Sequence, residues 1–340
     1  MKVIAIVNQK GGCGKTTTSV NLSFALSKKY KTLLIDLDPQ SHASLYLGMK
    51  NQEKSIVDVF ESFLNKKSVD LNSFVQKRRE NLFLLTSRIS LSIWEHKINN
   101  LPDKLFFLYK ILSLNAHYYD YVIIDCPPNL GLLSLNAIVA SSYVIVPLLI
   151  CPFSLEGLKT LGEILKLVKE KTTKDIKTHY LITQFDRRSK FSSAFLENIK
   201  KELKNNLLNT IIRTNISLRE ASFKGLSIFE YKPRSRGAED YSLLSEEITS
   251  FDQDKSWAYF FFKGKDFKEI YVVGDFNLWQ KKEEYKMRRI DEESWFLTLP
   301  LKKGKYRYKF LAENNWITDP YNPHQEDDNF GGKNSVIFIS

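Results

Sequence analysis

The chain has 340 residues, 43% hydrophobic side chains and a formal net charge of +11 at pH 7. This composition excludes an intrinsically disordered chain and is sufficient for the cores of two domains. No apolar run approaches the ~20 residues of a membrane helix. The three cysteines, Cys13, Cys126 and Cys151, lack the paired spacing of a zinc site or a disulfide framework, and the five histidines show no metal or triad spacing. We therefore expect a cytoplasmic protein without a membrane partner.

A glycine-rich loop follows the predicted strand 3–7 and precedes a helix-like stretch at 19–27. Residues 8–18 read Asn-Gln-Lys-Gly-Gly-Cys-Gly-Lys-Thr-Thr-Thr. In the ordinary phosphate-loop pattern, G-x-x-x-x-G-K-[ST], a glycine stands five residues before Gly14, but this chain has glutamine there and lysine next. Glycines let backbone N–H groups turn onto a polyphosphate at the start of a helix. The sequence therefore predicts a nucleotide-binding loop with two lysines.

The loop residues have distinct expected roles. The predicted contacts with ATP come from Gly11, Gly12, Cys13, Gly14, Lys15, Thr16 and Thr17. Lys15 is expected to reach the β- and γ-phosphates, and the Thr16 hydroxyl to hold Mg²⁺. Lys10 projects from the start of the loop, so in a face-to-face dimer it could act on the partner's nucleotide as an arginine finger does. Cys13 is explained by a need for a small side chain, with redox sensing as the alternative.

Two further apolar runs end in carboxylates. Residues 33–40 read Leu-Leu-Ile-Asp-Leu-Asp-Pro-Gln, and residues 121–128 read Tyr-Val-Ile-Ile-Asp-Cys-Pro-Pro. Ligands collect at the C-terminal ends of strands in an open parallel sheet. We expect Asp125, with Asp36 beside it, to hold Mg²⁺ partly through water, because Mg²⁺ keeps much of its hydration shell. Asp38 is better placed to orient an attacking water, so Lys10, Lys15 and Asp38 are the predicted catalytic residues.

These motifs resemble the ParA/Soj group of partition ATPases, within the deviant Walker A class. The resemblance runs over about 250 residues and includes VIIDCPPNLGLLSLNAI at 122–138, LITQFDRR at 181–188 and YKPRSRGAE at 231–239. It implies an α/β fold with a mostly parallel P-loop NTPase sheet and helices on both faces. It also implies an ATP-dependent homodimer that binds DNA without sequence preference on the nucleoid. Its weak ATPase activity is expected to be stimulated by a ParB-like protein.

Basic residues are concentrated before residue 251. Residues 251–340 contain 15 Lys and Arg against 15 Asp and Glu, whereas residues 159–240 contain 18 against 10. The excess could follow a phosphate backbone, and a solvated face is the alternative. The ParA group commonly has Pro-Arg-Asn-x-Arg before Leu-x-Glu-Ala, but residues 213–221 read Arg-Thr-Asn-Ile-Ser-Leu-Arg-Glu-Ala. With the arginines displaced, the predicted DNA contacts are Arg213, Arg219, Arg234 and Arg236.

Two related groups fit less well. MinD-type proteins attach to membranes by a C-terminal amphipathic helix, whereas this C-terminus has the pattern of strands. Iron–sulfur reductases of similar fold need paired cysteines, which this chain does not supply.

A second domain is predicted after a short polar linker. The boundaries are 1–250 for the ATPase domain, 251–256 for the linker and 257–340 for a C-terminal module. Aromatic and β-branched runs separated by turn residues predict strands at 257–263, 269–273, 295–299, 305–311 and 335–339. This pattern is typical of an all-β, immunoglobulin-like sandwich, with Trp257 and Trp295 in its core.

The module resembles the glycogen-binding module of AMP-activated kinase β-subunits. The similar segments are VVGDFNLW at 272–279, YKF at 308–310 and NWITDP at 315–320. The resemblance implies that it binds glycogen or another α-glucan.

By this resemblance, Trp279 and Trp316 stack on sugar rings, while Lys309 and Asn334 bond sugar hydroxyls. An exposed indole offers a flat apolar face to a pyranose, and a few polar groups fix its orientation. Residues 330–334 depart from the family's usual sequence around the asparagine. The alternative is that both tryptophans lie in the core and the module binds a protein or another copy of itself.

The predicted function is a ParA-like ATPase that positions a cargo and carries a glucan-binding module, for example for polysaccharide granules. One alternative is a glucan-sensing regulator or scaffold whose nucleotide switch has no DNA-partition role. Ordinary plasmid or chromosome partition is another.

Overall fold

The computed structural model describes residues 1–49, 53–66, 69–115, 118–151, 154–172, 176–186, 188–251, 255–289 and 292–339. Residues 252–254 of the predicted linker and the side chain of Trp257 lie outside the described part of the chain.

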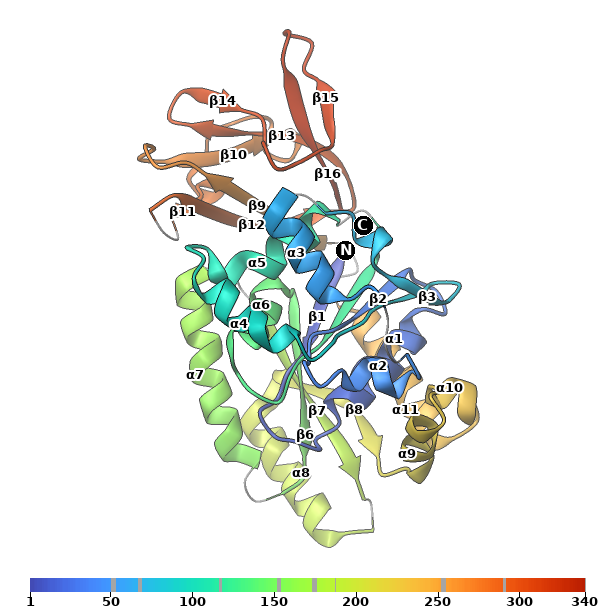
Figure 1. Cartoon of the computed structure of the whole chain (residues 1–340). Helices are drawn as coiled ribbons and strands as arrows, with labels where there is room; N and C mark the ends of the chain where they lie inside the picture. The colour runs from blue at the N-terminus through green and yellow to red at the C-terminus, as the bar shows by residue number, and fades with distance from the viewer. Residues whose placement is uncertain are drawn as a thin grey trace.

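Eight strands form one sheet in the order β3-β4-β2-β5-β1-β6-β7-β8 (Figure 1). Neighbouring strands run parallel except β3 and β4. The strands are β1 (Lys2–Ile6), β2 (Thr32–Asp36), β3 (Gln76–Arg79), β4 (Leu82–Leu85), β5 (Tyr121–Asp125), β6 (Tyr143–Leu149), β7 (Lys177–Phe185) and β8 (Leu207–Arg213). The prediction of a mostly parallel sheet is confirmed.

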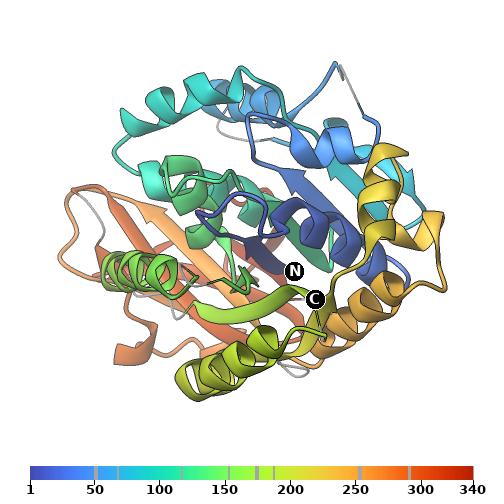
Figure 2. The same ribbon diagram turned by 90° about the horizontal axis from the view of Figure 1, so that it is seen from below.

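Helices cover both faces of this sheet (Figure 2). One face packs against α3 (Ile56–Lys66), α4 (Leu91–Asn99), α5 (Phe107–Leu114), α6 (Leu132–Ala140), α7 (Ser154–Thr172) and α8 (Lys190–Leu203). The other packs against α1 (Lys15–Leu26), α2 (His42–Tyr46), α9 (Ile216–Phe223), α10 (Ile228–Tyr231) and α11 (Arg236–Thr249). Short 3₁₀ turns are η1 (Leu71–Ser73), η2 (Lys104–Phe106) and η3 (Lys204–Asn206) in this domain, and η4 (Asp275–Asn277) and η5 (Glu283–Tyr285) further on.

The central strands are buried on both faces. Val3 and Ala5 of β1 belong to the core under α3 to α8, whereas Ile4 and Ile6 belong to the core under α1 and α11. Strands buried in this way read as continuous apolar runs, which is the pattern that predicted them.

The C-terminal module is a sandwich of two sheets. One has the order β10-β13-β16-β15 with β14 added to β13, and the other has the order β11-β12-β9. The strands are β9 (Lys255–Lys263), β10 (Ile270–Gly274), β11 (Arg288–Arg289), β12 (Ser294–Lys302), β13 (Gly304–Ala312), β14 (Asn315–Ile317), β15 (Gln325–Asp327) and β16 (Lys333–Ile339). Phe260 and Leu297 from the second sheet pack against Val272 and Phe310 from the first. The predicted all-β sandwich is confirmed; β11, β14 and β15 are short strands that the sequence pattern did not reveal.

An aromatic interface joins the module to the ATPase domain. The ring of Phe106 lies 4.9 Å from that of Phe296 on β12, measured between centroids. Tyr109 on α5 lies 5.0 Å from Tyr259 on β9 and 5.2 Å from Phe296. The hydroxyls of Tyr259 and Ser142 are 2.8 Å apart. The outer face of the three-stranded sheet is therefore buried against the ATPase domain.

No helix in the described part of the chain is long and apolar enough to cross a membrane.

Candidate nucleotide site and carbohydrate face

The phosphate loop connects β1 to α1 at the C-terminal edge of the sheet. Gly12 and Gly14 have φ angles of +72° and +89°, a conformation that glycine adopts without steric cost. Gly14 is the residue that precedes α1, and the helix consequently begins at Lys15 rather than at residue 19. The loop is also held from β7, where Thr183 donates to the Cys13 carbonyl at 2.8 Å and Gln184 to the Gly12 carbonyl at 2.7 Å.

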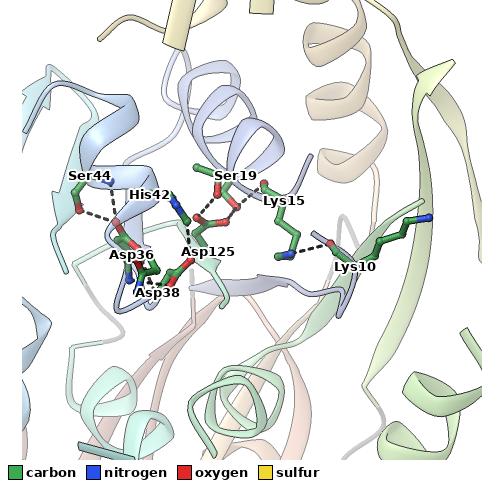
Figure 3. Close-up of polar contacts among 10 residues, drawn as sticks. Lys10, Lys15, Ser19, Asp36, Asp38, His42, Ser44 and Asp125 are labelled. Carbon is green, nitrogen blue, oxygen red and sulfur yellow. Dashed lines mark hydrogen bonds and ion pairs between the residues drawn. The ribbon is translucent and has the colours of Figure 1, made fainter. Parts of the chain in front are cut away.

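The two lysines of the loop point in different directions (Figure 3). Lys15 is buried, and its Nζ donates to the Lys10 carbonyl at 3.1 Å. The Lys10 side chain extends away from the aspartates, and its Nζ lies 2.5 Å from the Cys151 sulfur. The Lys10 ammonium thus lies apart from the aspartates of its own protomer, while its carbonyl accepts from Lys15.

Asp125 is bound to α1. Thr16 Oγ1 donates to Asp125 Oδ2 at 2.8 Å, and Ser19 Oγ lies 2.7 Å from Asp125 Oδ1. The structure therefore brings together Thr16 and Asp125, two of the three residues that the sequence assigned to Mg²⁺, from positions more than 100 residues apart.

Asp36 is the neighbour of Asp125 in the sheet, since the two residues pair in the register of β2 and β5. Asp36 accepts hydrogen bonds from the Ser44 amide at 2.8 Å and the Ser44 hydroxyl at 2.7 Å. Burial raises the pKa of both carboxyls, and the charge of Asp125 raises the pKa of Asp36 further. Two carboxylates this close favour a cation between or beside them.

Asp38 is buried but reaches the edge of the site. Its Oδ2 lies 2.9 Å from Nδ1 of His42, and its Oδ1 accepts from the Gln40 amide at 2.9 Å. His42 is more than half exposed. The direct contact with His42 holds the Asp38 carboxylate at the solvent-facing side of the site.

The donor set suits Mg²⁺. Within the described residues there is no group of three or more His, Cys, Asp and Glu side chains that could hold a metal. Mg²⁺ commonly takes only one or two carboxylates, and waters and nucleotide phosphates complete its octahedron. The Thr16 hydroxyl with the Asp125 carboxylate fits that requirement.

A hollow of about 320 Å³ lies beside the phosphate loop. Its walls include Gly14 and Thr17 from the loop and helix, Gln184 after β7, and Thr214 and Asn215 after β8. Its position next to the phosphate-binding backbone suits the base and sugar of a nucleotide.

Sequence reasoning missed several residues of this site: Ser19, His42, Ser44, Cys151, Thr183, Gln184 and Asn215. A weak signal existed for His42, which stands four residues after Asp38 in the sequence. Gln184 lies in the segment 181–188 that carried the family resemblance, but no pattern placed Gln184 or Cys151 beside the loop, because both reach it only through the parallel order of β1, β6 and β7. Burial raises the pKa of the Cys13 thiol, which agrees with a packing role for that residue.

The four candidate DNA contacts differ in solvent exposure and in whether they are already paired within the chain. Arg219, Arg234 and Arg236 are exposed. Arg213 instead donates from Nε to Asp240 at 2.8 Å and from a terminal nitrogen to Glu239 at 2.5 Å. Its guanidinium is therefore already paired within the chain.

The tryptophans of the module lie on the outer face of the five-stranded sheet. Trp316 is 52% exposed, and its ring centroid lies 6.2 Å from that of Trp279 with the planes at 39°. Trp279 packs on Tyr271, Val273 and Leu311, and its Nε1 donates to Asp275 at 3.2 Å. The two rings form a bent aromatic surface outside the core, whereas Trp295 is buried as predicted.

Lys309 and Asn334 belong to the same side of this sheet. Lys309 pairs with Val273 in the register of β10 and β13, on the face that carries Leu311 and Trp279. Its Nζ donates to Asp328 at 2.6 Å. Asn334 is only 6% exposed, so of the four predicted sugar contacts it presents the least surface.

Comparison with known proteins identifies both parts of the chain. Residues 1–178 match the family model described as "AAA domain", and residues 259–340 match "Glycogen recognition site of AMP-activated protein kinase". The chain is 36% identical over 257 residues to the chromosome partitioning protein ParA of Myxococcus xanthus (strain DK1622), covering 75% of this chain and 90% of that protein. It is 38% identical over 254 residues to the sporulation initiation inhibitor protein Soj of Bacillus subtilis (strain 168), covering 73% and 98%.

A solved structure agrees with these matches. The cobyrinic acid a,c-diamide synthase of Mycobacterium smegmatis, with a bound ATP analogue and magnesium, superposes with a TM-score of 0.62. The sequences are 28% identical, and the match covers 72% of this chain and 93% of that one. Together with the two-lysine loop and the paired aspartates, these relationships show that the chain belongs to the ParA/Soj family of P-loop ATPases and carries a C-terminal glycogen-recognition module.

Proposed function

We propose that this protein is an ATP-switched positioning ATPase that carries an α-glucan as cargo. The observation that supports it most is the presence, in one chain, of a two-lysine phosphate loop beside paired aspartates and an exposed tryptophan pair on a fixed module. ATP joins two protomers, the joined pair binds DNA nonspecifically, and hydrolysis separates them.

In the nucleotide site, the loop amides and Lys15 bind the phosphates, and Thr16 with Asp125 holds Mg²⁺. Bound Mg²⁺ neutralises charge that builds up on the phosphate oxygens during hydrolysis. The hydrogen bonds from Ser44 hold the carboxylate of Asp36, the second acid of the site, in place beside Asp125. Asp38 orients the attacking water, and His42 fixes the rotamer of Asp38.

Lys10 completes the site of the other protomer. Its contact with Cys151 holds the ammonium at the edge of the loop, away from its own phosphates. In a face-to-face dimer the ammonium then stabilises transition-state charge on the partner's nucleotide, as an arginine finger does.

The DNA contacts are assigned to Arg219, Arg234 and Arg236, which are exposed and lie on or beside α9, α10 and α11. Arg213 orients α11 through Asp240. A protein that stimulates hydrolysis, of the ParB type, would act on the joined dimer.

The glucan site is assigned to Trp279, Trp316 and Lys309, with Asn334 at its buried edge. The bent pair of indoles matches successive pyranose faces of a curved α-glucan chain. Lys309 can exchange its contact with Asp328 for a sugar hydroxyl.

Co-sedimentation with glycogen tests this proposal. The wild type should pellet with glycogen, and the Trp279→Ala/Trp316→Ala variant should remain in the supernatant. Phe223→Ala, which removes a 90% exposed ring from the ATPase domain, is the matched control and should pellet normally. A wild type that stays in the supernatant would contradict the glucan assignment.

A second candidate is a glucan-sensing switch without DNA affinity, and the internal pairing of Arg213 favours it. Binding to nonspecific DNA with ATP at several salt concentrations decides between them. A DNA-binding protein should lose affinity steeply with salt, and Arg234→Ala should reduce the slope by about one unit. No ATP-dependent binding at low salt would favour the sensor.

A further inference from the structure

The nucleotide and the sugar are expected at opposite ends of the molecule. Asp36 and Asp125 end β2 and β5, and the phosphate loop follows β1. The module meets the other ends of these strands. Met1, before β1, shares a hydrophobic core with Tyr259 and Phe261 of β9. The Ser142 hydroxyl, before β6, lies 2.8 Å from the Tyr259 hydroxyl. Figure 1 shows the module above the N-terminal ends of the strands.

We call the outer surface of the five-stranded sheet, which carries Trp279, Trp316 and Lys309, the sugar face. It is the side of the module turned away from the ATPase domain. The three-stranded sheet carries Tyr259 and Phe296 into the interface, and the five-stranded sheet lies beyond it. A five-residue strand spans roughly 16 Å, and packed sheets lie about 10 Å apart. Adding the interface layer, the tryptophan pair lies on the order of 35 Å from the phosphate loop.

The contacts between the module and the ATPase domain also fix the direction in which the sugar face points. Aromatic contacts between Phe106, Tyr109, Tyr259 and Phe296 have centroid distances near 5 Å. The ammonium of Lys110 lies 3.8 Å from the Phe261 ring centre and forms an ion pair with Asp103. An interface with buried rings and a shielded ion pair holds the module as a rigid part of the protomer.

We propose that the ATP-bound dimer is a glucan cross-linker, whose two sugar faces point outward from opposite ends. This inference rests on the proposed function, because it assumes that the phosphate-loop faces join and that the module binds glucan. Two rigid sites that point apart cannot occupy neighbouring units of one short chain. They can occupy two particles, or two distant branches, at the same time.

The geometry makes different demands on short and large glucans. Maltoheptaose is too short to reach both sites, so its affinity is the same for the monomer and the dimer. Glycogen particles present many chain ends, so each dimer bridges two particles. ATP therefore controls cross-linking while leaving the intrinsic affinity for the sugar unchanged.

Light scattering of a glycogen suspension with the full chain tests the inference. ATP should raise the scattering about tenfold over ADP, as bridged particles grow. An excess of maltoheptaose should reverse the rise. Lys10→Ala, which removes the residue proposed to act across the dimer, should lose the ATP response, and Trp279→Ala/Trp316→Ala should scatter as glycogen alone.

Three further measurements separate failure of the inference from failure of the proposed function. If sizing shows an ATP dimer that pellets with glycogen but does not raise scattering, the inference is wrong and the proposed function stands. If ATP tightens maltoheptaose binding, the sites face the same chain and the inference is again wrong. If no dimer forms, or nothing pellets, the proposed function fails first.

Discussion

The candidate nucleotide site and the proposed sugar face offer a ligand opposite kinds of surface. The nucleotide site is made of buried charges, in which Asp36, Asp125 and Lys15 are each already held by hydrogen bonds to the chain. The sugar face is an exposed apolar surface, in which Trp316 has few contacts and is half open to solvent. The first gains specificity from fixed polar geometry, and the second from shape and flatness. Substitutions should therefore affect the two regions through different measurable quantities.

The largest effect is expected at the interface that joins the regions. Phe296→Ala removes a fully buried ring between the domains and should lower the free energy of unfolding by about 4 kcal/mol. Denaturant titration measures this change. In the variant, the two domains should unfold in two separate transitions. The control is Phe330→Ala, whose ring is 94% exposed and whose removal should change stability by under about 0.5 kcal/mol. Equal effects would show that the interface does not couple the domains.

The next effect concerns a buried acid of the module. Burial raises the pKa of Asp319 from 3.8 to about 6, although Tyr308 donates to it at 2.6 Å. The folded state therefore binds this proton more tightly than the unfolded state does. Stability from this group is complete below about pH 4 and is lost as the pH rises through about 6, by about 3 kcal/mol.

Asp319→Asn should abolish this pH dependence of the module's unfolding, because the amide does not titrate. Urea titrations between pH 4 and 7 would measure the difference between the variant and the wild type. A wild type whose stability rose across this range would contradict the assignment to Asp319.

Within the nucleotide site, the two lysines should separate binding from assembly. Lys15→Ala should weaken ATP binding about 100-fold, because it removes a charged hydrogen-bond donor worth about 3 kcal/mol. Lys10→Ala should keep monomer affinity and lose both the dimer and hydrolysis. Calorimetry with Mg-ATP and sizing chromatography give the two readouts. A Lys10→Ala protein that still dimerised would refute the cross-protomer role.

The smallest effect is expected for a single ring of the sugar face. Trp316→Ala should weaken maltoheptaose binding about tenfold, since one stacking contact contributes about 1.4 kcal/mol. Its nucleotide affinity should equal that of the wild type. Loss of both affinities would mean that the ring supports the fold rather than the ligand.

Prediction from the sequence reached further in the nucleotide site than in the module. The order of loop, helix and strand-end carboxylates is local in the chain, so Thr16 and Asp125 could be assigned from motif and strand pattern. The position of His42 depends on the turn after β2, for which its spacing from Asp38 was only a weak signal. The position of Cys151 depends on the placement of β6 beside β1, which no local pattern encodes. Arg213 could not be distinguished from Arg234 in sequence, because only packing shows that α11 brings Asp240 to it.

In the module, the longer strands could be predicted from the aromatic runs, but the exposure of each tryptophan could not. Trp279 reaches the outer face through two consecutive residues with positive φ, Leu278 at 54° and Trp279 at 59°. Such a turn is rare for large side chains and has no clear sequence signal. Asn334 was assigned by resemblance alone, and its burial depends on pairing with Glu326 of β15, a strand that the pattern did not predict.

The fixed placement of the module also determines how mechanical load would pass through the protein. A pull on the sugar face enters the ATPase domain near the N-terminal ends of β1 and β6, where Met1 and Ser142 contact the module, and leaves it at the phosphate loop. The load then runs along the parallel strands, so the hydrogen bonds between them are sheared together rather than opened one by one. The central sheet is therefore the stiff element of the molecule along this direction.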